Sequence, residues 1–169
     1  MKMGSTMKKI FAAGILTLAS LAAHAEYEQV NLTVFGMDCA PCAHAIHVSM
    51  KGIQGVDTVD VDLNTGLVAI KLTPGNNAAM RQFNQAVEKN GFTHKDAVVV
   101  ARGKLTGTAS APFFEIAGTA DRFALVPAAT GIDVSGFLGK TVMVTGVLPQ
   151  AAKGKVSDTM RYNTITEAR

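Results

Sequence analysis

The chain has 169 residues, with 16 Lys and Arg against 13 Asp and Glu, two cysteines and no tryptophan. Three of the lysines, Lys2, Lys8 and Lys9, lie in a leading segment that we expect to be removed, which leaves 13 basic and 13 acidic side chains. A formally neutral mature protein lacks the basic excess that binds phosphate backbones, so we expect no nucleic-acid partner.

The leading segment has the pattern of a secretory signal peptide. Two lysines precede an apolar run over residues 10–23, and the sequence Ala-His-Ala at 23–25 fits a cleavage site. We therefore expect residues 1–25 to be cut off and the mature protein to reside in the periplasm. A retained N-terminal anchor is the alternative, but the apolar run is short for a transmembrane helix, and we expect no membrane-embedded part.

The rest of the chain divides by charge and by pattern. Residues 26–96 carry 5 basic and 8 acidic side chains, whereas residues 97–169 carry 8 and 5. Both cysteines and the three histidines that follow the signal peptide lie in the first part. We predict two domains, 26–96 and 97–169, joined by a very short linker.

The first domain alternates strand and helix patterns. Apolar residues alternate over 27–35, 56–63 and 67–72, and recur at helical spacing after Cys42 and again over 79–87. The Asn-Thr-Gly sequence at 64–66 predicts a hairpin turn, and a fourth strand begins at Phe92. The predicted order βαββαβ gives an α+β, ferredoxin-like domain with an antiparallel sheet and both helices on one face.

The two cysteines lie on the predicted connection between the first strand and the first helix. They form a CxxC motif, Cys39-Ala40-Pro41-Cys42, preceded by Gly36. Free N–H groups and the positive end of the helix dipole favour thiolates at a helix start. Two such thiolates can hold a soft metal ion, or can cycle between dithiol and disulfide. Because an exported protein can form disulfides, the redox state of the pair stays open.

The spacing of the motif residues over 28–96 resembles that of the heavy-metal-associated domain, which occurs in copper chaperones, metal-pumping P-type ATPases and periplasmic mercury-binding proteins. The residues that carry the resemblance are Gly36, Met37, Cys39, Cys42, Ile46, Gly55, Val56, Val59, Val61, Asn64, Gly66, Gly91 and Phe92. The resemblance implies that Cys39 and Cys42 are the metal ligands, that Met37 is a buried support under the loop and that Phe92 lies beside the site. It also implies a partner that is a metal-transporting membrane protein or another metal-binding domain.

The identity of the ion depends on Asp38. Two thiolates alone suit Cu(I) or Hg(II). An Asp at this position resembles the modules of zinc, cadmium and lead pumps, where the carboxylate is a third ligand, which would favour Zn(II) or Cd(II). The alternative is that Asp38 caps the helix at its N-terminus.

The histidines are weaker candidates for ligands. His44 and His47 lie two and five residues after Cys42, and neither spacing places them on its helix face. We expect both to be on a solvated face, and His94 to occupy a surface position early in the last strand.

The second domain has an all-β pattern. Short strands are predicted over 98–105, 113–116, 123–126, 141–148 and 162–166, separated by Gly and Pro. Five strands in so short a segment indicate a small closed barrel, since closure removes exposed edges. The sequence from Leu138 to Gly146 loosely resembles the fourth-strand region of OB-like barrels.

The leading hypothesis is a periplasmic carrier that captures a soft or borderline metal ion through Cys39 and Cys42 and transfers it by ligand exchange. It makes and breaks no substrate bond, so we expect no catalytic residue and no enzyme. The alternative is a periplasmic thiol–disulfide oxidoreductase that uses the same cysteines. Thioredoxins usually place Trp before the first Cys, and this chain has none. A purely structural disulfide ranks last, because a bridge over so short a loop constrains the unfolded chain little.

Overall fold

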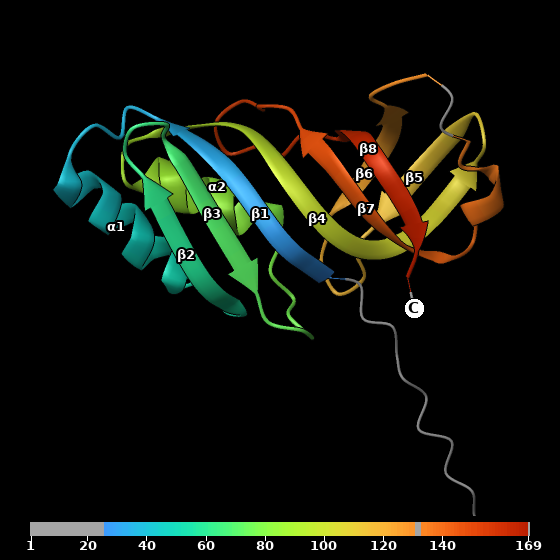
Figure 1. Ribbon diagram of the computed structural model, residues 1–169, viewed down its shortest axis with the longest axis horizontal. Coiled ribbons are helices and arrows are strands. Elements are labelled where there is room, and N and C mark those ends of the chain that lie inside the picture. Colours follow the sequence, from blue (N-terminus) through green and yellow to red (C-terminus); the bar gives the residue numbers. More distant parts are fainter. Residues whose placement is uncertain (1–25, 131–132, 169) are drawn as a thin grey trace, which may run out of the picture.

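The computed structural model describes residues 26–130 and 133–168 (Figure 1). The expected signal peptide lies outside the described residues. Within the described ranges, neither α-helix combines the length and the hydropathy that a membrane-spanning helix needs.

The first half of the described chain has the predicted βαββαβ order. Its elements are β1 (Glu26–Phe35), α1 (Ala40–Lys51), β2 (Val56–Asp62), β3 (Leu67–Leu72), α2 (Met80–Lys89) and β4 (Thr93–Thr108). The strands are antiparallel in the order β2-β3-β1-β4. The two helices contact each other, α1 packing on β2 and α2 on β4. The ferredoxin-like expectation is therefore confirmed in its element order and strand pairing.

Local sequence explains these elements. Val30, Leu32 and Val34 alternate along β1 and are buried, as a half-covered strand requires. The turn between β2 and β3 needs its glycine, because Gly66 has φ 72° and a side chain there would meet the Val34 carbonyl oxygen at 2.4 Å. This hairpin is fixed against the end of β1 that leads into the cysteine loop.

β4 runs through the predicted linker. It is one strand of 16 residues that pairs with β1 along its first part and with β5 and β7 farther on (Figure 1). The prediction of two separate strands here, one from Phe92 and one over 98–105, was therefore wrong. The pairing is irregular just before the expected boundary: one residue of β1, Thr33, faces two of β4, Lys95 and Asp96, which is a β-bulge. The division at 96/97 stays a prediction, and it falls inside β4.

The second half is a closed ring of paired strands. It adds β5 (Ala111–Glu115), β6 (Arg122–Pro127), β7 (Thr141–Leu148) and β8 (Thr159–Glu167), with a short 3-10 helix η1 (Ser135–Phe137). Pairing runs β4-β5-β6-β8-β7 and returns to β4, and β6–β8 is the one parallel pair among the described strands. Four of the five predicted strands are thus present as β5–β8, and the fifth, 98–105, is part of β4. The likeness to an OB barrel stays a prediction. Buried apolar side chains of both halves form one continuous cluster.

Candidate metal-binding site

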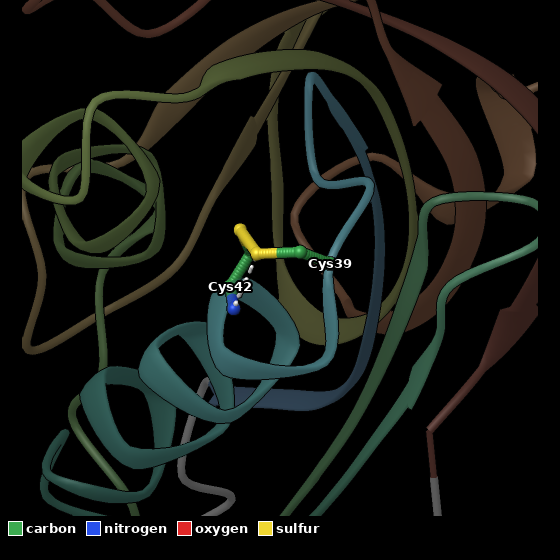
Figure 2. Close-up of a disulfide and its surroundings, with 2 residues drawn as sticks. All are labelled: Cys39 and Cys42. Atoms are coloured by element: carbon green, nitrogen blue, oxygen red, sulfur yellow. Dashed lines mark hydrogen bonds between the residues drawn. A yellow bond between two sulfur atoms is a disulfide. The ribbon is translucent and has the colours of Figure 1, made fainter.

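The CxxC motif lies where β1 ends and α1 begins (Figure 2). Gly36 adopts φ 89°, which turns the chain out of the strand without the strain that a side chain would cause. Pro41 lies in the first turn of α1, where its missing N–H leaves no hydrogen bond unmade. The helix begins at Ala40, and its N-cap residue is Cys39.

The two sulfurs are joined in a disulfide, and their Cα atoms are 5.1 Å apart (Figure 2). The backbone N–H of Cys42 donates a hydrogen bond to Sγ of Cys39 at 3.2 Å. Both cysteines are half-buried, and Cys42 packs against the core. After reduction, the same N–H and the start of the helix would stabilise negative charge on Sγ of Cys39.

Asp38 stands beside the sulfurs. One of its carboxylate oxygens and the two Sγ atoms all lie within 4.8 Å of one another, the one such group of three potential ligands found over 26–130 and 133–168. The interpretation of Asp38 as the helix cap is wrong, because Cys39 occupies the N-cap position and its own sulfur accepts the capping hydrogen bond. The exposed Asp38 carboxylate makes no hydrogen bond with another described residue, so it is free to turn toward an ion.

Two apolar residues frame the loop. Met37 is 4% exposed and belongs to the buried cluster beneath it. Phe92 precedes β4, and its Cδ1 lies 3.7 Å from the point where a Cβ on Gly36 would be. Both residues occupy the places that the resemblance implied.

His44 and His47 lie on α1 and do not join the group formed by Asp38 and the cysteines. The predicted surface position of His94 is wrong: the residue is 4% exposed, and its Nε2 lies 3.2 Å from Oε1 of Glu88. The bulge in β4 explains the error, because its extra residue reverses the inward and outward alternation. The Glu88–His94 pair was not predicted from the sequence for that reason, because regular alternation does not indicate that His94 points inward.

The comparison with known proteins bears on the first half of the chain. Residues 31–93 match the heavy-metal-associated domain. An uncharacterized protein of Haemophilus influenzae is 33% identical over 89 residues, which are 52% of this chain and 95% of that protein. Copper chaperone CopZ of Staphylococcus saprophyticus is 33% identical over 65 residues, 38% of this chain and 94% of the chaperone.

The chain belongs to the heavy-metal-associated domain family. A solved structure described as a CopZ metallochaperone is 33% identical and covers 38% of this chain and 94% of its own, with a TM-score of 0.36. The matched family residues end at 93, so nearly the whole ring of β4–β8 lies outside the family domain.

Proposed function

We propose that this protein is a carrier for one soft or borderline metal ion, which Cys39 and Cys42 bind as thiolates. The observation that carries the proposal is the group of Asp38, Cys39 and Cys42, whose ligand atoms lie within 4.8 Å at the start of α1. Membership of the heavy-metal-associated domain family and the likeness to copper chaperones support it.

The disulfide fixes the order of events. Sulfur ligates soft metals as the thiolate, so two electrons from a thiol reductant must first open the bond between Cys39 and Cys42. The two thiolates then hold Cu(I) or Hg(II), which accept two sulfur ligands. A thiolate of the partner attacks the ion, and each cysteine leaves in turn, so the ion passes on without ever being free.

The ion itself is the finer part of the proposal. Cu(I) and Hg(II) need only the two sulfurs, and the likeness to copper chaperones supports Cu(I). The unpaired carboxylate of Asp38 next to those sulfurs supports a three-ligand site as well, which would admit Zn(II) or Cd(II).

The cellular setting is also proposed. The lysines and apolar run of residues 1–25 support export to the periplasm through a signal peptide. The partner that receives the ion would be a metal-transporting membrane protein or another metal-binding domain.

The ring β4-β5-β6-β8-β7, with β6 and β8 parallel, supports an OB-like barrel as a second domain after residue 96.

Ligand exchange predicts how the transfer rate depends on the acceptor. Reduced, Cu(I)-loaded protein is mixed with increasing concentrations of a dithiol acceptor, and the loss of the ion is followed in time. We expect the rate to rise in proportion to acceptor concentration, because the acceptor takes part in the rate-limiting step. A rate that is independent of the acceptor would mean that the ion dissociates first, and would contradict transfer by ligand exchange.

The half-buried disulfide between Cys39 and Cys42 favours one second candidate, a thiol–disulfide oxidoreductase. An external thiolate would attack one sulfur, form a mixed disulfide and release the other cysteine as a thiolate. An insulin-reduction assay decides between the two functions. We expect little turnover, and turnover comparable to that of a thioredoxin would reverse the ranking.

A further inference from the structure

The connection between β7 and β8, residues 149–158, leaves the ring and lies against α2 (Figure 1). Its Gly154 N–H donates to Oε1 of Glu88 at 2.9 Å, in the last turn of α2. Farther back on the same helix, the Asn84 side chain donates to the Lys155 carbonyl at 3.1 Å. The β7–β8 connection is therefore tied to α2 at two successive turns.

The same connection is tied to β4. The N–H of Gln150 donates to Oδ1 of Asp96 at 2.8 Å, in the bulge. Oε1 of Glu88, which accepts from Gly154, also faces Nε2 of His94 at 3.2 Å, and these two side chains are 11% and 5% exposed. One carboxylate oxygen of a largely buried side chain thus joins the ring, α2 and β4.

These bonds enclose the turn between α2 and β4, which carries Phe92. Within this turn, Asn90 donates its side-chain N–H to Oγ of Ser49 on α1 at 2.8 Å. Phe92 lies against Gly36, the first residue of the cysteine loop. The turn therefore touches the cysteine loop directly and the helix that carries Cys42.

The side of this turn that faces the ring is not filled. A cavity of about 270 Å³ lies between residues 91–94 and residues 150–153 of the β7–β8 connection, with Glu88 in its wall. Because this pocket separates the turn from the β7–β8 connection, the hydrogen bond from Gly154 to Glu88 is the link between them beside it. Glu88 accepts the hydrogen bond that links α2 to the β7–β8 connection beside this pocket.

We propose that the β7–β8 connection of the ring controls metal release, acting through Glu88 as a positioning residue that keeps Phe92 against the cysteine loop. The proposal rests on the proposed carrier function and gives the ring a part in it. Held in place, Phe92 covers one side of the loop and hinders the partner's thiolate from reaching the ion. When the turn moves into the cavity, that side of the loop opens.

The test is the rate of Cu(I) transfer from the reduced, full-length protein to a dithiol acceptor, measured beside the equilibrium affinity for Cu(I). Glu88→Ala removes the shared acceptor, and we expect transfer to be roughly three- to tenfold faster. Glu88→Gln keeps a carbonyl oxygen that can accept from Gly154, and we expect it to restore most of the wild-type rate. Glu167→Ala is the matched control: it breaks the 2.9 Å ion pair with Lys140 at the opposite end of the β7–β8 hairpin and should leave the rate unchanged.

A second variant makes the outcome independent of how well Glu88→Ala folds. His94→Leu fills the same buried place but cuts the link from Glu88 to β4, and it should also speed transfer. If both variants bind Cu(I) and transfer it at the wild-type rate, the ring does not control release and the proposal is wrong, whatever their melting temperatures. Failure of the wild-type protein to bind Cu(I), Hg(II), Zn(II) or Cd(II) would instead overturn the carrier function on which the proposal rests.

Discussion

The Tyr27 hydroxyl, at the start of β1, donates a 2.7 Å hydrogen bond to Oδ2 of Asp121, which precedes β6 in the ring. The same oxygen accepts the N–H of Met80, the first residue of α2, at 2.7 Å. The N-cap residue of α2 is Ala79, which has no side chain that can cap a helix. Asp121 therefore caps α2 from the other half of the molecule, and it joins β1 to that cap.

Removal of Asp121 is expected to be the most destabilising single change at this junction. Asp121→Ala leaves the buried Tyr27 hydroxyl and the Met80 N–H without an acceptor, at a cost of roughly 3 kcal/mol. Tyr27→Phe keeps the packing of the aromatic side chain and leaves Asp121 to cap α2, and it should cost about 1.5 kcal/mol. Urea unfolding of both variants, with the exposed Asp60→Ala as control, measures these values. Asp121→Ala unfolding at the same urea concentration as the control would show that the junction contributes nothing to stability.

The same junction predicts a loss of stability at alkaline pH. Burial, and then the neighbouring Asp121 carboxylate, raise the pKa of Tyr27 well above its usual 10.0. The unfolded chain therefore loses this proton first, so the stabilisation is complete below about pH 10 and falls as the pH rises above it. Tyr27→Phe should flatten the decline in unfolding free energy between about pH 10 and pH 11. The decline that remains would come from Tyr162, whose pKa is also raised, by burial and by Asp133. Equal slopes for variant and wild type would contradict this assignment.

Fragments test the proposed division into two domains. The first residues of β1 pair with Val98–Arg102, which lie beyond residue 96. A fragment of residues 26–104 keeps these partners, and we expect it to fold and to bind metal. A fragment of residues 26–96 lacks them and should be less stable, because half of β1 becomes an unpaired edge. Circular dichroism and thermal melting distinguish the two fragments, and an unfolded 26–104 fragment would mean that the first half depends on the ring.

Sequence patterns predicted most of the elements because their alternation is regular. β3 and β7 have the predicted ends, residues 67–72 and 141–148, since turn residues bound both runs. The pattern failed where the backbone departs from regular pairing. The bulge at Lys95 and Asp96 made a continuous strand look interrupted, and it turned His94 inward. No alternation rule contains that information, because it depends on how β1 pairs with β4.

The sequence predicted which cysteines form the site, but it did not predict the backbone geometry around them. The spacing of Cys39 and Cys42 and their position before a helix placed both on one loop. Which residue caps α1 depends on a single backbone conformation, and that of Cys39 is extended, with φ −136° and ψ 149°. The sequence offered Asp38 as an equally good cap.

Asp38 is expected to select between classes of ion. Asp38→Ala should weaken Zn(II) or Cd(II) binding by roughly tenfold or more and leave Cu(I) binding within about twofold, because a two-coordinate ion does not use the carboxylate. Since Asp38 does not cap α1, the melting temperature should not change. Competition titrations of the reduced proteins with both classes of ion give the affinities. A small loss of affinity shared by all ions would show that the Asp38 carboxylate is not a metal ligand.

The central claim is that Cys39 and Cys42 together hold one metal ion after their disulfide is reduced. The direct measurement is a titration of the reduced protein with Cu(I) against a competing chelator, for wild type, Cys39→Ala, Cys42→Ala and the control His44→Ala. We expect one tightly bound ion in the wild type and in His44→Ala, and no high-affinity binding in either cysteine variant, because a single thiolate is left. Unchanged affinity in either cysteine variant would contradict the account.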